Sequence, residues 1–209
     1  MTRIVIADDH ALIRKGLRQI VSDQQDMTVA GEAASAGELL TLLRSQPADM
    51  VVLDLSLGVR SGIDLLKHIK SEFPNLPVVI LSMHSEEMFA LRALKAGASG
   101  YVEKSSAPEA LLKAIRHLVR GGTYVSEALA QRMAADVRHG TATTPHERLT
   151  DREFEVFRLL GSGMSVTEIA QSLTLSVKTV STHRTRALAK TGLHNNADIV
   201  EYVISNGLR

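Results

Sequence analysis

The sequence predicts an α/β domain with a doubly wound, five-stranded parallel sheet, followed by a small all-α domain. Short apolar runs alternate five times with stretches of helical periodicity up to about residue 120. A polar, proline-broken segment lies at 138–146, and only helical patterns follow from residue 149. Alternating strands and helices are typical of a parallel sheet, and 209 residues suffice for two cores.

The strands are expected at 3–7, 27–32, 50–53, 77–82 and 100–102. The helices between them are expected at 11–21, around 39–43, from about 62 to before Pro74, at 86–95 and at 108–119. The run at 50–53 is apolar throughout and is followed directly by Asp54, as in a strand covered on both faces. Periodicity alone does not distinguish this run from a buried helix segment, and Asp54 alone could simply cap a helix.

Three segments follow from these patterns: a first domain at 1–121, a linker at 122–148, and a second domain at 149–209. The linker is expected to begin as a helix at 127–137 and to continue as a flexible stretch. The second domain is expected to hold helices at 151–160, 165–173, 176–191 and 196–205. Thr150 and Glu153 have the spacing of a capping box at the start of the first of these.

Composition excludes several classes of function. The chain has no cysteine, and therefore no disulfide, thiolate nucleophile or cysteine metal site. Without cysteine and without a His-x-x-x-His pair, His10 and His84 are interpreted as flanking polar residues. Few aromatic residues argue against a single-strand binder, and a net charge of +1 means that nucleic-acid binding needs a local basic patch. No signal peptide or membrane-spanning run is visible, so we expect a cytoplasmic protein with no membrane partner.

Five polar side chains follow the carboxyl ends of predicted strands, namely Asp8, Asp9, Asp54, Ser82 and Lys104. In a parallel sheet these ends lie at one edge. Three carboxylates so close together need a hard divalent cation, and oxygen ligands suit Mg²⁺. With the lysine and the serine hydroxyl, such a site holds a phosphoryl group, and Asp54 is the natural nucleophile. Singly, each residue has a simpler structural role, so the combination carries the prediction.

The set Asp8-Asp9, Asp54, Ser82, Tyr101 and Lys104 resembles the response-regulator receiver domain of two-component signalling, a flavodoxin-like fold. The resemblance implies that Asp54 accepts a phosphoryl group from a sensor histidine kinase. It also implies that Ser82 and Tyr101 form a switch, in which the hydroxyl moves toward the phosphoryl group and the ring follows inward.

The same resemblance implies that Mg²⁺ is held by Asp9, Asp54 and the backbone carbonyl of Ser56, while Asp8 helps to position the ion. One position departs from the family pattern. Gly58 stands where the family usually has proline, four residues after the acceptor aspartate. Glycine removes the fixed φ of proline, which puts the stiffness of this loop in question.

Two expected helices at 165–173 and 176–191, joined by a short turn, have the arrangement of a helix-turn-helix. No acidic residue occurs from 169 to 197, and the cations there are Lys178, Arg184, Arg186 and Lys190. Short or polar residues share the face at 178, 181, 182, 185 and 189, and the opposite face offers Val177, Val180, Ala187 and Leu188 to a core. A basic helix alone is more often simply solvated, but as the second helix of this motif it favours DNA.

The motifs Leu149-Thr150-Asp151-Arg152-Glu153, Glu168-Ile169-Ala170 and Lys178-Thr179-Val180-Ser181-Thr182-His183 resemble the LuxR-type helix-turn-helix, and both domains together resemble the NarL/FixJ subfamily. By this resemblance Ser181, Thr182 and Thr185 read bases. The residues expected to contact phosphates are Lys178, His183, Arg184 and Arg186. Ser181 departs from the lysine common at its position. The last helix could pair with its copy in a dimer or pack within its own domain.

We therefore expect a transcription regulator rather than an enzyme, in which phosphorylation of Asp54 favours a homodimer that binds promoter DNA. Two alternatives remain open. Gly58 allows a DNA-binding regulator whose receiver works without phosphate. A Mg²⁺-dependent phosphohydrolase is disfavoured, because the sequence Asp54-Leu55-Ser56 has no second acid two residues on.

Overall fold

The computed structural model describes residues 1–57, 62–83, 86–105, 108–139 and 144–208. The chain forms two compact units, Met1–Ala135 and Asp136–Arg209, each with its own core. Within these described ranges, no helix is both long enough and apolar enough to cross a membrane.

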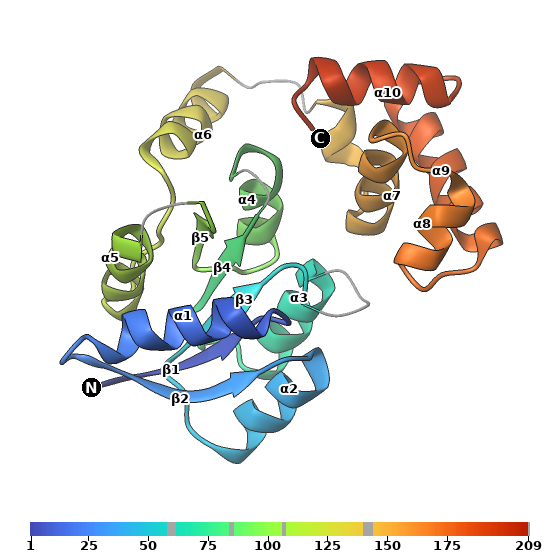
Figure 1. The fold of residues 1–209 in the computed structure, drawn as a ribbon. Helices are drawn as coiled ribbons and strands as arrows, with labels where there is room; N and C mark the ends of the chain where they lie inside the picture. The colour runs from blue at the N-terminus through green and yellow to red at the C-terminus, as the bar shows by residue number, and fades with distance from the viewer. Residues whose placement is uncertain (58–61, 84–85, 106–107, 140–143, 209) are drawn as a thin grey trace. The chain divides into compact units, whose positions relative to one another are not determined.

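The first unit is built on a parallel sheet with the strand order β2-β1-β3-β4-β5 (Figure 1). The strands are β1 (Thr2–Ala7), β2 (Met27–Ala33), β3 (Met50–Asp54), β4 (Val78–Ser82) and β5 (Gly100–Glu103). Every residue of β3 and β4 is buried, which is why their sequences are apolar without alternation. The predicted five-stranded parallel sheet is confirmed, and a helix at 50–53 is excluded.

Helices cover both faces of this sheet. They are α1 (Ala11–Ser22), α2 (Ala36–Ser45), α3 (Gly62–Glu72), α4 (Glu86–Lys95) and α5 (Pro108–Val119), followed by α6 (Glu127–His139). One apolar cluster joins the sheet to α1 and α5 through residues such as Leu17 and Ile115. The other joins it to α2, α3 and α4 through Leu39, Leu66 and Ala90. The sheet is thus the middle layer of three, as expected of a doubly wound domain.

The strand order changes direction between β1 and β3, and this places the polar residues that follow them together. Ala7 of β1 pairs with Leu53 of β3, so Asp8 and Asp54 come level at the carboxyl edge. Ligands of open α/β sheets bind at such a switch point. The backbone topology alone therefore brings two of the predicted site residues side by side.

The segment after α5 pairs with the outer edge of the sheet. Tyr124 forms an isolated parallel bridge with Gly100, and the backbone N–H of Tyr101 donates to the carbonyl of Tyr124 at 3.1 Å. A side chain at Gly100 would start 2.9 Å from the same carbonyl oxygen, so glycine allows this close approach. Leu129 of α6 is buried in the same core cluster as Tyr101. The first part of the predicted linker at 122–148 therefore packs against the first unit.

The second unit is all helical. After the 3₁₀ helix η1 (Pro145–Arg148) it contains α7 (Asp151–Gly161), α8 (Val166–Ser172), α9 (Val177–Thr191) and α10 (Asn196–Ser205). The four predicted helices are confirmed with boundaries shifted by a residue at most. The capping box of Thr150 and Glu153 is present, and Gly192 ends α9 in the left-handed conformation.

The short helix η1 lies within the segment that was predicted to be flexible. Its His146 is hydrogen-bonded through Nδ1 to the hydroxyl of Tyr202 at 3.0 Å, and its ring stands 6.2 Å from that of Phe154. These contacts hold residues 145–148 on α7 and α10. No hydrophobic periodicity marks a four-residue 3₁₀ helix, which is why the sequence did not reveal it.

Candidate functional sites

Asp54 occupies the centre of the carboxyl edge of the sheet. It ends β3, and only 1% of its surface is exposed. Its Oδ1 accepts a hydrogen bond from the backbone N–H of Ser56 at 3.1 Å, and its Oδ2 accepts one from Nζ of Lys104 at 2.7 Å. Burial raises the pKa of the Asp54 carboxyl, against the opposing effect of Lys104. The lysine is therefore the main partner of the carboxylate charge in this site.

Lys104 links the end of β5 to two carboxylates. Its backbone N–H donates to the carbonyl of Ser82 at 2.7 Å, and its Nζ lies 2.7 Å from Oδ2 of Asp54 and 2.7 Å from Oδ2 of Asp8. Burial alone would lower the pKa of Lys104, but the hydrogen bonds to both acids raise it overall. Lys104 is therefore positively charged between the two carboxylates. A positive charge at this position is what its predicted role, neutralising phosphate oxygens, requires.

The four side chains of Asp8, Asp9, His10 and Asp54 form one cluster, in which the potential ligand atoms lie within 4.8 Å of one another. Asp8 is buried, whereas the side chain of Asp9 is 43% exposed. Nδ1 of His10 lies 2.7 Å from Oδ1 of Asp9 and 3.3 Å from Oδ1 of Asp8. The sequence predicts that the three acids lie together, and it gives His10 only the role of a flanking polar residue. Its immediate position after the two acids was the only available signal.

This cluster has the chemistry of a hard divalent cation site. Two buried carboxylates and one exposed carboxylate offer oxygen ligands with access from solvent. Oxygen ligands of this type suit Mg²⁺, which binds through a few carboxylates and keeps several waters. The residues present therefore fit the ion that the sequence predicted.

Ser82 and Tyr101 lie together behind the acidic cluster. Ser82 ends β4 and is fully buried, and Tyr101 lies in the neighbouring strand β5 with 1% of its surface exposed. Burial raises the pKa of the Tyr101 phenol, and its side-chain hydrogen bond with Ser82 acts in the opposite direction. The structure brings the two predicted switch residues into contact, with the ring inside the domain.

Two loops at this edge fall partly outside the described residues, including Gly58 and His84. The described start of α3 shows a close backbone contact beside them. A Cβ atom at Gly62 would lie 2.2 Å from the carbonyl oxygen of Leu55. Only glycine permits this approach, which joins the start of α3 to the loop after Asp54.

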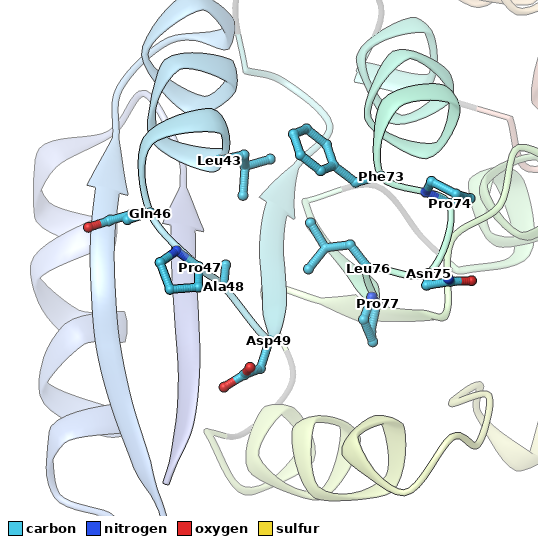
Figure 2. Close-up of a pocket in the computed structure, with 10 residues that line it drawn as sticks. All are labelled: Leu43, Gln46, Pro47, Ala48, Asp49, Phe73, Pro74, Asn75, Leu76 and Pro77. Atoms are coloured by element: carbon cyan, nitrogen blue, oxygen red, sulfur yellow. The ribbon is translucent and has the colours of Figure 1, made fainter.

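A surface pocket of about 550 Å³ lies at the opposite, amino edge of the sheet (Figure 2). Its walls are mainly apolar and include Leu43, Phe73 and Leu76. Its one acid, Asp49, is paired with Arg3 at 2.7 Å, and the hydrogen bond from that guanidinium lowers the pKa of Asp49 to about 2. None of the acidic-cluster residues lines this pocket, so it is separate from the predicted site.

In the second unit, α8 and α9 form the predicted helix-turn-helix. Val180 and Ala187 of α9 are buried, while Lys178, Thr182 and Thr185 are exposed on another side. The hydroxyl of Thr182 donates to the carbonyl of Lys178 at 2.9 Å, and that of Thr185 donates to the carbonyl of Ser181 at 3.0 Å. Both hydroxyl protons are thus used within the helix, and the threonines offer methyl groups and acceptor lone pairs outward.

The remaining candidate residues of α9 lie in more varied surroundings. Arg186 is exposed, and Arg184 donates through Nε to Oδ1 of Asn196 at 2.5 Å. Nδ1 of His183 is buried and has no hydrogen-bond partner among the described residues. Val177 was predicted to join the core, but 48% of its surface is exposed because it stands in the first turn of the helix.

Glu153 ties α9 to α7 in a way that the sequence did not reveal. Only 2% of this residue is exposed, and its Oε2 accepts hydrogen bonds from Nζ of Lys190 at 2.6 Å and from the backbone N–H of Thr150 at 2.9 Å. Lys190 is therefore paired within the domain. Of the four cations counted in the basic segment, it is the one whose ion pair is seen among the described residues.

The fold and both sites define a class of protein. Residues 4–116 match the response regulator receiver domain, and residues 147–203 match the bacterial regulatory proteins of the luxR family. The chain is thus a two-component response regulator with a DNA-binding LuxR-type domain.

Within that class, it belongs to the NarL/FixJ family of response regulators. It is 30% identical over its full length to the response regulator UvrY of Escherichia coli, covering 96% of that protein. It is 36% identical to the oxygen regulatory protein NreC of Staphylococcus aureus, with 99% and 98% of the two chains covered. RcsB of Salmonella enterica, bound to the promoter rprA in the presence of the phosphomimetic BeF₃⁻, is similar at 31% identity and a TM-score of 0.71, with 98% and 100% of the chains covered.

Proposed function

We propose that Asp54 accepts a phosphoryl group from a phosphohistidine of a sensor kinase, and that this modification controls promoter binding by the second unit. The observation that carries the proposal is the buried carboxylate of Asp54, which shares Lys104 with Asp8 at the carboxyl edge of the sheet. A carboxylate needs a preorganised positive environment to receive an anionic group. The carboxyl edge of the sheet supplies this positive environment through the ammonium group of Lys104.

In the transfer, a carboxylate oxygen of Asp54 attacks phosphorus, a P–O bond forms, and the P–N bond to the histidine of the kinase breaks with its electron pair left on that nitrogen. Lys104 Nζ already touches the oxygen Oδ2 and needs only a small movement to follow the new charge. Mg²⁺ bound by Asp9, Asp54 and the carbonyl of Ser56, with Asp8 beside it, would neutralise part of the phosphoryl charge. The kinase supplies the phosphoryl group, so the chain is a regulator rather than an enzyme.

The switch that we propose uses Ser82 and Tyr101. On phosphorylation the Ser82 hydroxyl turns from the phenol of Tyr101 toward a phosphoryl oxygen on Asp54, which is within reach because Ser82 and Asp54 end the neighbouring strands β4 and β3. The Tyr101 ring is already buried. Loss of its contact with Ser82 then changes the packing around β5 and α4 rather than drawing an exposed ring inward.

Intact-mass measurement after incubation with Mg²⁺ and acetyl phosphate tests the acceptor. The wild-type chain should gain the mass of one phosphoryl group, and Asp54→Asn should gain none. Asp23→Asn is the matched control, because Asp23 is an exposed carboxylate at the end of α1 that accepts a hydrogen bond from the side chain of Gln19 and lies outside the acidic cluster. Equal uptake by wild type and Asp54→Asn would refute the assignment.

For DNA, we propose that α9 enters the major groove of promoter DNA. Ser181, Thr182 and Thr185 face the base edges, where threonine methyl groups suit thymine methyl groups. Lys178 and Arg186, both exposed, contact phosphates, and Arg184 does so if its bond to Asn196 opens. His183, which is partly exposed although its Nδ1 is buried, is the remaining phosphate contact.

Fluorescence anisotropy with a pool of random duplexes measures the phosphate part of this binding. Lys178→Ala should weaken binding to all duplexes alike and lower the slope of log K against log salt by about 1. Lys113→Ala is the control, because Lys113 is an exposed lysine of α5 in the other unit. An unchanged salt slope would argue against Lys178 as a phosphate contact.

We further propose that phosphorylation favours a homodimer, which then binds DNA. The related RcsB has been solved as two dimers bound to two parallel DNAs, and two copies of α9 would read a repeated half-site. Sedimentation velocity with and without acetyl phosphate measures the mass of the particle. A monomer under both conditions would contradict the dimer.

A further inference from the structure

Glu103 connects the predicted phosphorylation site to helix α4. It ends β5 and directly precedes Lys104. Its Oε1 accepts a hydrogen bond from the backbone N–H of Glu86 at 2.7 Å. Glu86 is the first residue of α4, so the carboxylate of Glu103 satisfies an N–H that has no partner within the helix.

Glu86 in turn reaches the linker helix α6. Its Oε1 accepts a hydrogen bond from the backbone N–H of Ser126 at 2.7 Å. Ser126 precedes α6 and caps it, because its Oγ accepts from the N–H of Leu129 at 3.1 Å and its carbonyl accepts from the N–H of Ala130 at 3.0 Å. One side chain of α4 therefore holds the residue at which the linker helix begins.

Apolar packing at the start of α6 accompanies the hydrogen bond between Glu86 and Ser126. Leu129, in the first turn of α6, is 6% exposed and belongs to the cluster that contains Ala90 and Ala93 of α4 and Tyr101 of β5. The start of the linker helix is thus held to the receiver by Leu129 and by the carboxylate of Glu86. Both contacts lie beside the residues that we propose as the switch.

We propose that Glu86 is a latch that holds the start of the linker helix on the receiver and releases it when Asp54 is phosphorylated. The release rests on the proposed function. Ser82 lies four residues before Glu86 in the chain, and the backbone of Lys104 is bonded to that of Ser82. Lys104 directly follows Glu103, whose carboxylate accepts the N–H of Glu86. Movement of the Ser82 hydroxyl and of Lys104 Nζ toward a phosphoryl group therefore shifts both Glu103 and Glu86.

A small shift suffices for release, because hydrogen bonds weaken steeply with misalignment. In the chain, the linker helix lies between the receiver and the DNA-binding helices. Freeing its first turn changes how the two units are tethered without any direct contact between the phosphoryl group and DNA-binding residues. Glu86 acts here as a positioning residue.

Hydrogen exchange of the full chain, measured by mass spectrometry on peptides that cover residues 126–133, tests the latch. Without a phosphoryl donor, Glu86→Ala should speed exchange in these peptides roughly ten- to a hundredfold, as expected for loss of a bond to a charged group. Glu86→Gln keeps one acceptor oxygen and should give a smaller increase. Glu127→Ala is the matched control, since Glu127 is exposed at the start of the same helix and accepts a hydrogen bond from Gln131, one turn further along α6.

Protection of β3 amides at 50–54 in every variant shows that the receiver remains folded. With Mg²⁺ and acetyl phosphate, the wild type should reach the exchange rate of Glu86→Ala, and Glu86→Ala should not rise further. Exchange in Glu86→Ala equal to that in Glu127→Ala overturns the latch, and retained protection in phosphorylated wild type overturns its release. Intact mass of the same samples reports phosphorylation separately, so failure of Asp54 to accept a phosphoryl group is distinguished from failure of the latch.

Discussion

Replacing Glu153 by glutamine should destabilise the DNA-binding unit through the loss of one buried ion pair. Glutamine still accepts the N–H of Thr150 and so keeps the capping box, but it removes the charge that faces Lys190 at 2.6 Å. A hydrogen bond to a charged group contributes about 1.5–3 kcal/mol and a neutral one about 1 kcal/mol. The side chain of Lys190 is 38% exposed and is hydrated after the change, so we expect a net loss of about 1–2 kcal/mol.

Differential scanning calorimetry of the full chain measures this loss. For a unit of this size, 1 kcal/mol lowers Tm by roughly 4–8 °C. Glu168→Gln is the matched control, because Glu168 has the same capping-box position on α8 but is exposed and has no ion pair with any cation in the described part of the chain. It should lower Tm by less. Equal shifts for the two variants would refute the contribution of the ion pair.

The same pair makes a prediction about pH. Burial alone would raise the pKa of Glu153, but the hydrogen bonds from Lys190 and Thr150 lower it overall. A carboxyl whose pKa is lower in the folded state stabilises that state above its unfolded pKa, and the stabilisation is lost as the pH falls through the folded pKa. The difference in Tm between wild type and Glu153→Gln should therefore shrink below about pH 4. A constant difference from pH 7 to acid would contradict the assignment.

Two further substitutions test the packing of the first unit. Gly62→Ala places a Cβ 2.2 Å from the backbone oxygen of Leu55 and should cost about 1–3 kcal/mol, seen as a lower urea midpoint; an unchanged midpoint would exclude the close contact. Leu129→Ala should cost about 2–3 kcal/mol in the same assay, because Leu129 is 6% exposed in the receiver core. Leu12→Ala, at a residue 83% exposed, is its control, and equal effects would mean that α6 does not pack there.

The acidic site was predictable because its residues are tied to strand ends. Parallel strands joined by helices place their carboxyl ends at one edge, so Asp8, Asp54 and Lys104 had to meet once the strands were recognised. The involvement of His10 was not predictable in the same way. A histidine in a loop can turn toward solvent or toward the acids, and only the side-chain geometry showed its contact with Asp9.

In the helix-turn-helix, too, some features follow from the sequence and others only from the tertiary structure. Its helices and caps follow from periodicity and from local motifs such as Thr150 with Glu153. The partners of individual cations do not, because Lys190 and Glu153 are far apart in the sequence and meet only when α7 packs on α9.

By itself, the sequence determined the two units, the order of their elements and the residues at the acidic edge, since these depend on local periodicity and on the fixed geometry of parallel sheets. Only the tertiary structure decided which charged groups pair and where the linker begins. Glu86, Glu103 and Ser126 lie in three different segments, and no local pattern marks them. Their contacts exist because α4, β5 and α6 pack together, and packing between distant segments is not encoded in any single stretch of the chain.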